Sequence, residues 1–144
     1  MFSLRSFLLI SSLLLVSVSS TAIAEDILVV GHISSPNMDK RQLQKIFLAK
    51  IRDLPNGVKA ELVDLPEGDE TRDAFYQHLV NRDDMQLKAY WSRLIFTGSG
   101  SPPKVMDSSQ EVIDFVAENP GAIGYVNASD IQANASVKIL LKLE

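Results

Sequence analysis

The stretch that decides the fold is "AELVDLPEGDETRDAFYQHL", residues 60–79. Its first six residues form an apolar run typical of a buried strand, and "DETRDAFYQHL" has the spacing of an amphipathic helix. A loop with Pro66 and Gly68 joins the two, which predicts a strand–loop–helix unit of an α/β protein. The start of such a helix offers free backbone N–H groups and a positive dipole end, so an anion can bind there.

The loop in this stretch is strongly acidic, because Asp64, Glu67, Asp69 and Glu70 fall within seven positions. Acids in a first helical turn stabilise the helix dipole by about 0.3 kcal/mol or more each. Their spacing does not match a calcium-binding loop. Three interpretations stay open: an anion site that has been lost, a site for another ligand, and an acid-capped helix.

Strands and helices alternate along the rest of the chain. The sequence predicts strands at 26–33, 59–65, 121–126 and 136–143, and helices at 38–51, 69–80, 82–96 and 108–118. A Gly/Ser/Pro loop, 97–104, separates the third and fourth helices. This alternation predicts one α/β domain with a sheet covered by helices.

The N-terminal segment predicts a secretory signal peptide over residues 1–24. Arg5 supplies a positive start, the segment 7–18 is apolar, and Ala22 and Ala24 form an A-x-A cleavage pattern. The apolar segment is shorter than the roughly 20 residues that span a bilayer. We therefore expect a mature domain of residues 25–144 in the periplasm, without stable membrane insertion after cleavage.

Composition excludes several classes of function. The chain has 14 Lys and Arg against 18 Asp and Glu, and no basic stripe, which argues against a nucleic-acid partner. It has no Cys, so its stability depends on the core rather than on disulfides. Its two His have no motif around them, and no nucleophile elbow or phosphate P-loop is present. We expect no catalytic residues, no metal, no cofactor and no enzymatic activity.

Four segments, in order, resemble the phosphate ABC-transporter substrate-binding proteins, which are type 2 periplasmic-binding proteins. They are "LQKIFLAKI" (43–51), "DLPEGDETRDAF" (64–75), "FTGSGSPPK" (96–104) and "GAIGYV" (121–126). The family is built from two α/β lobes that close on a ligand, and the four segments all belong to one lobe. The resemblance therefore implies a single lobe with three layers, a mixed sheet flanked by helices.

The resemblance also implies an oxyanion site at the acidic loop. The family holds a dehydrated oxyanion there with an Arg and a Ser-Gly-Thr triplet. Thr71 matches the family Thr, whereas Asp69 and Glu70 replace the Ser and Gly, and the Arg has no counterpart. Arg72 can supply the missing guanidinium if it turns back over the helix start. The alternative is that Arg72 pairs with a neighbouring acid.

Two further loops are candidates for the same ligand. Ser34 and Ser35 follow the first strand at its carboxyl end, where ligands bind in open α/β sheets. The alternative for these two serines is turn and N-cap chemistry. Thr97 and Ser99 are expected to line the same edge, and the alternative for them is a flexible connector. The expected ligand-binding residues are Ser34, Ser35, Gly68, Asp69, Thr71, Arg72, Thr97 and Ser99.

Two hypotheses of function follow. The first is a secreted periplasmic solute-binding protein that binds phosphate or a related oxyanion, as part of or accessory to an ABC-type uptake system. The second is a single-lobe interaction or adaptor module that keeps the fold without the ligand. Such a module docks on an envelope or transport partner. Under the first hypothesis, two copies of the lobe can form a homodimer that rebuilds a ligand cleft.

Overall fold

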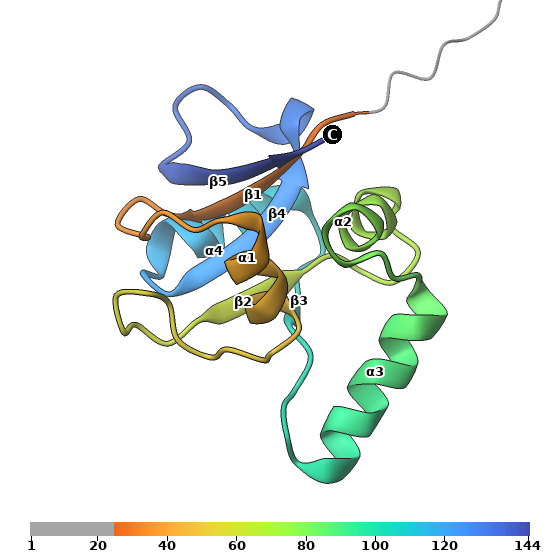
Figure 1. Ribbon diagram of the computed structural model, residues 1–144. Coiled ribbons are helices and arrows are strands. Elements are labelled where there is room, and N and C mark those ends of the chain that lie inside the picture. The colour runs from red at the N-terminus through yellow and green to blue at the C-terminus, as the bar shows by residue number, and fades with distance from the viewer. Residues whose placement is uncertain (1–24) are drawn as a thin grey trace, which may run out of the picture.

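A computed structural model describes residues 25–144, so the predicted signal peptide lies outside the described residues (Figure 1). The structure confirms the predicted α/β class. Its elements are β1 (Ile27–His32), α1 (Lys40–Phe47), β2 (Glu61–Asp64), α2 (Glu70–Val80), α3 (Asp84–Thr97), β3 (Lys104–Val105), α4 (Ser109–Glu118), β4 (Ala122–Asn127), the 3-10 helix η1 (Ala128–Asp130) and β5 (Val137–Leu143).

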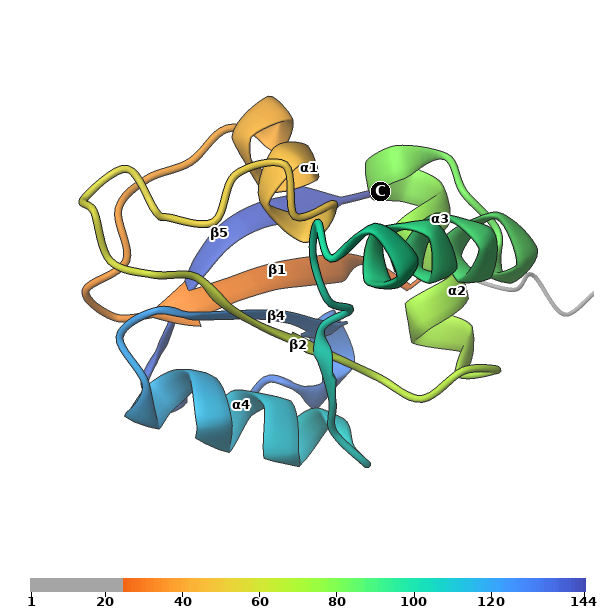
Figure 2. The ribbon, with the colours of Figure 1, turned by 90° about the horizontal axis from the view of Figure 1, so that it is seen from below.

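The strands form one five-stranded mixed sheet in the order β3-β2-β4-β1-β5. β2 runs parallel to β3 and β4, whereas β1 runs antiparallel to β4 and β5. Helix α4 covers one face of the sheet, and α1 and α2 lie on the other (Figure 2). This arrangement confirms the predicted three-layer lobe. Because β1 and β2 run in opposite directions, their carboxyl ends lie at opposite ends of the sheet.

The predicted boundaries need two corrections. The first helix ends at Phe47 rather than near residue 51, because Ala49 adopts a left-handed backbone with a φ of 54°. The loop 97–104 ends in the short strand β3, which pairs with Val63 and Asp64 of β2. A two-residue strand has no periodicity of its own, so only its pairing with β2 reveals it.

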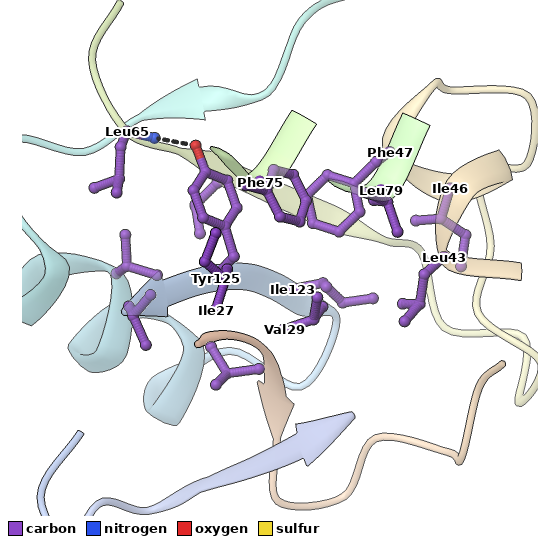
Figure 3. Packing of buried hydrophobic residues seen from close by; sticks show 14 of the residues in the cluster. Ile27, Val29, Leu43, Ile46, Phe47, Leu65, Phe75, Leu79, Ile123 and Tyr125 are labelled. Atoms are coloured by element: carbon purple, nitrogen blue, oxygen red, sulfur yellow. Dashed lines mark hydrogen bonds between the residues drawn. The ribbon is translucent and has the colours of Figure 1, made fainter. Parts of the chain in front are cut away.

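Aromatic side chains connect the sheet to the helices above it. Tyr125 of β4 stacks on Phe75 of α2, with ring centroids 3.7 Å apart and planes 7° apart. Phe47 of α1 contacts the Phe75 ring edge-on at 4.8 Å (Figure 3). All three side chains are fully buried. This cluster fixes α2, and therefore the acidic loop before it, against the centre of the sheet.

Gly121, just before β4, lies where two backbone segments meet. A Cβ at this position would lie 2.1 Å from the carbonyl oxygen of Lys59, and the Gly121 carbonyl accepts a hydrogen bond from the N–H of Glu61 at 2.8 Å. Backbone atoms cannot move aside as a side chain can. Gly121→Ala is therefore expected to lower the free energy of unfolding by about 1–3 kcal/mol, measured by urea denaturation.

Gly100→Ala is the matched control for Gly121→Ala. At Gly100 the nearest atom to an added Cβ is the end of the Leu94 side chain, at 3.2 Å, which can rotate away, and the Cβ of Ala49 lies at an ordinary contact distance of 3.5 Å. Its effect is expected to stay within about 0.5 kcal/mol. Equal losses for the two variants would show that the backbone contact at Gly121 is not the cause.

Candidate functional site

The carboxylate of Asp64, at the end of β2, lies at the centre of a buried hydrogen-bond network. One oxygen accepts from the hydroxyl of Tyr125 and from the N–H of Leu65, the latter at 2.9 Å. The other accepts from the hydroxyl of Tyr76 at 2.9 Å and from Nε of Arg72 at 3.4 Å. Asp64 is only 5% exposed. Both of its oxygens are therefore fully supplied with donors from the same chain.

Arg72 is held between two carboxylates. Besides its contact with Asp64, its Nη1 donates to Asp84 at the start of α3. The guanidinium carbon lies 5.1 Å from the centroid of the Tyr76 ring. The Arg72 side chain is 12% exposed. The positive charge of Arg72 is thus balanced by carboxylates of the same chain. This is the pairing that the sequence left open as the alternative to anion binding.

Burial decides how this network is protonated. Burial raises the pKa of Asp64, while the Tyr125 hydrogen bond, the charge of Arg72 and the Tyr76 hydrogen bond oppose the rise. Burial and the neighbouring carboxylate together raise the pKa of Tyr76 and of Tyr125. Both phenols therefore keep their protons and act as donors to Asp64.

The start of α2 is closed by its own acid. The side chain of Asp69 accepts a hydrogen bond from the N–H of Arg72 at 3.0 Å and so caps the helix. Gly68 precedes it with a φ of 86°, a left-handed conformation that glycine adopts without strain. Gly68 and Asp69 therefore form a turn and a helix cap.

Thr71, the residue that matches the family motif, lines a hollow of about 430 Å³ beside α2. Among the described residues, Glu25 and Glu70 line the same hollow, and no Lys, Arg or His side chain does. Two carboxylates repel a dianion that enters here. The remaining lining residues are Ile27, Ala74 and Asn127.

Ser34 and Ser35 lie at the other end of the sheet from Thr71, because β1 runs antiparallel to β4 and β2 runs parallel to it. The Ser34 hydroxyl shares a hydrogen bond with Nδ1 of His32 at 2.7 Å. Ser35 is buried, and its carbonyl accepts from Nζ of Lys138 at 2.8 Å. The structure does not bring these serines together with the start of α2.

Thr97 and Ser99 form a third, separate place, at the end of α3. Their hydroxyls share a hydrogen bond of 2.8 Å, and the Ser99 carbonyl accepts from Arg52 at 2.5 Å. Asp84, which binds Arg72, lies at the opposite end of this 14-residue helix. A helix of that length spans about 21 Å. The eight predicted residues therefore occupy three separate places.

A basic hollow of about 540 Å³ lies close to Ser99 and was not predicted. Arg52, Lys59 and Lys104 line it, with Glu61 as the single acid. Nζ of Lys104 lies 5.1 Å from the centroid of the Phe115 ring. These residues lie up to about 60 positions apart in sequence, so only the fold brings them together. Among the described residues, cations also outnumber acids in a second hollow of about 410 Å³, which Arg41, Lys45, Lys50 and Arg82 line without an acidic side chain.

Within residues 25–144, no helix is both long and apolar enough to cross a bilayer. In the same part of the chain, no three side chains of the His, Asp or Glu type converge so that they could hold a metal ion.

No protein-family model and no curated protein sequence matches the chain. Among solved structures, it is similar to a Clostridium perfringens protein described as a phosphate ABC transporter substrate-binding protein with bound phosphate (20% identity, TM-score 0.63). It is also similar to an ABC-type phosphate transport receptor from Vibrio cholerae (17%, 0.61) and to PstS from Borrelia burgdorferi (16%, 0.59).

These similarities cover 81% of this chain but only 44, 45 and 46% of the three structures. The chain thus spans less than half the length of the proteins it resembles. At such low identities the likeness is one of fold, and those structures are of transport proteins rather than enzymes. The chain has the fold of a single lobe of a periplasmic-binding protein.

Proposed function

We propose that this chain is a secreted, non-catalytic lobe that works in the periplasm by binding a protein partner, without a free oxyanion at the start of α2. The observation that carries this proposal is the pairing of Arg72 with Asp64 and Asp84. At an anion site, an arginine pairs with the negative charge of the ligand. Here Arg72 pairs with two carboxylates of the same chain instead.

An external oxyanion would have to compete with these carboxylates. A dianion beside Arg72 approaches Asp64, and Asp69 and Glu70 begin the adjacent helix. Each like-charge pair at about 4 Å costs about 1 kcal/mol in water and about 4 kcal/mol near a protein surface. Thr71 is the single retained family donor, and one hydroxyl does not offset repulsion of that size.

Exposed apolar side chains support binding of a protein. On α3, Met85 is 81% exposed and Phe96 is 92% exposed. Large apolar groups gathered on one face mark interaction surfaces more often than isolated ones do. Both belong to a helix that projects from the body of the lobe (Figure 1).

A second candidate is the binding of phosphate or a related oxyanion in the service of ABC-type uptake. The descriptions of the similar structures favour it, and so does the basic hollow lined by Arg52, Lys59 and Lys104. The places to test are then the start of α2 around Thr71, the basic hollow, and the hollow lined by Arg41, Lys45, Lys50 and Arg82.

A thermal-shift titration with phosphate and with sulfate separates the two candidates. A ligand that binds the native state stabilises it by RT ln(1 + [L]/Kd), so even a weak site shows at millimolar concentration. We expect no stabilisation beyond that given by sodium chloride at the same ionic strength. Specific stabilisation by phosphate would overturn the proposal.

Two variants and a matched control then test whether an oxyanion binds at the start of α2 or in the basic hollow. Loss of the shift in Thr71→Ala assigns it to the start of α2, and loss in Lys104→Ala assigns it to the basic hollow. Lys40→Ala is the matched control, because Lys40 is an exposed lysine at the start of α1 and lines no part of that hollow.

A further inference from the structure

Helix α3 is apolar on two opposite faces. Its inner face packs on the lobe through the buried side chains of Leu87, Tyr90 and Trp91. The hydroxyl of Tyr90 also donates to the carbonyl of Leu48, at 2.5 Å. On the outer face, Met85 and Phe96 are almost fully exposed. This departs from the pattern of a helix that packs on one side only, whose outer face is polar.

The outer face has a regular spacing. Met85, Ala89, Ser92 and Phe96 follow one another at intervals of four, three and four residues, and all are exposed. At 100° per residue they form one line opposite the inner face. We call these four residues the outer stripe. The two end residues, Met85 and Phe96, have large side chains, and the two middle residues have small ones.

The outer stripe is complementary to a reversed copy of itself. When two α3 helices lie antiparallel, Met85 of one copy lies opposite Phe96 of the other, and Ala89 lies opposite Ser92. The small residues at the centre let the helix axes approach to about 8 Å. The large residues at each end then cover one another. This is the self-complementary pattern of a two-fold symmetric contact.

The helix dipoles favour the same orientation. The side-chain charges do not decide it, because Arg82 and Lys88 lie at the same end of α3 as Asp83 and Asp84, and Asp84 is already bound to Arg72. An antiparallel pair opposes the two helix dipoles, whereas a parallel pair would align them.

We propose that α3 is a homodimer surface, in which the outer stripes of two copies of this chain pack antiparallel. This inference rests on the proposed protein-binding function and identifies its partner as a second copy. A 14-residue helix is about 21 Å long, so the contact is small and the dimer is expected to be weak and concentration-dependent.

Sedimentation velocity of the full chain over a wide concentration range tests the dimer. The wild type is expected to pass from monomer to dimer, and Phe96→Glu to weaken the dimer by about tenfold or more. Phe96 is 92% exposed, so the variant should keep its melting temperature. Ile33→Glu is the matched control, because Ile33 is 65% exposed and lies in the turn after β1, outside α3.

Single cysteines test the orientation, since the natural chain has none. In the antiparallel pair the two copies of Ser92 lie about 4.5 Å apart along the axis, and the two copies of Met85 about 16 Å apart. Ser92→Cys is therefore expected to form a disulfide-linked dimer on mild oxidation, whereas Met85→Cys is not. In a parallel pair both would cross-link.

Two results would overturn the homodimer surface: a monomer at every concentration, and a dimer that Phe96→Glu leaves intact. Efficient cross-linking through Met85→Cys would overturn the antiparallel orientation. A monomer that binds a different periplasmic protein through α3 would overturn the homodimer and leave the proposed function standing. Specific stabilisation by phosphate would overturn the proposed function, whatever the oligomeric state.

Discussion

Replacing Asp64 by alanine is expected to lower the free energy of unfolding by about 3–5 kcal/mol, because it removes one partner of a buried ion pair. The variant leaves the Arg72 guanidinium without its inner carboxylate and the hydroxyls of Tyr76 and Tyr125 without an acceptor. Such a loss is a large part of the stability of a domain of this size. Urea denaturation followed by circular dichroism measures it.

Asp84→Ala is the matched control, since Asp84 is the other carboxylate bound to Arg72. The Asp84 side chain is 33% exposed, compared with 6% for Asp64, so water can solvate the Arg72 guanidinium where the Asp84 carboxylate is removed. Its effect is expected to stay below about 1 kcal/mol. Equal losses of stability in the two variants would contradict the claim that burial of Asp64 causes its larger effect.

The effect of pH on Asp64 has a definite sign. Burial raises the pKa of Asp64 above its ordinary value of 3.8, so the folded protein holds this proton more tightly than the unfolded chain does. The stability that this tighter proton binding adds is fully present below pH 3.8 and is lost as the pH rises through the raised pKa of the folded state. The free energy of unfolding is measured by urea denaturation across this pH range. The difference in this free energy between the wild type and Asp64→Asn is expected to narrow as the pH rises.

The fold was largely predictable from the sequence because its signals are local. The apolar run before Asp64 and the helical spacing around Phe75 lie within 20 consecutive residues, and the structure confirms both elements. The predicted end of α1 was wrong because Ala49 adopts a left-handed backbone conformation, which the spacing of apolar residues does not indicate.

The site was predictable only in part because its contacts are long-range. Tyr125 reaches Asp64 across 61 positions in sequence, and no spacing rule connects them. One signal was present: a tyrosine within a buried strand requires a partner for its hydroxyl. The direction of β1 was equally decisive, since it places Ser34 and Ser35 away from the start of α2.

Replacing Phe75 by alanine is also expected to lower the free energy of unfolding by about 3–5 kcal/mol. Phe75 is fully buried, stacks on Tyr125 and meets Phe47 and Tyr76 edge-on. The smaller side chain leaves a cavity at the point where α1, α2 and β4 meet. Phe96→Ala is the matched control, because Phe96 is 92% exposed; its effect on a dilute sample is expected to stay within about 0.5 kcal/mol.

The Phe75 ring also positions the network around Asp64. Its stacking on Tyr125 holds that ring in the orientation in which the hydroxyl reaches the Asp64 carboxylate. A double-mutant cycle of the milder Phe75→Leu with Asp64→Asn is therefore expected to show a coupling of about 1 kcal/mol, measured by urea denaturation. Strictly additive losses would mean that the aromatic stack and the buried carboxylate stabilise the lobe independently, with no positioning of Tyr125 by Phe75.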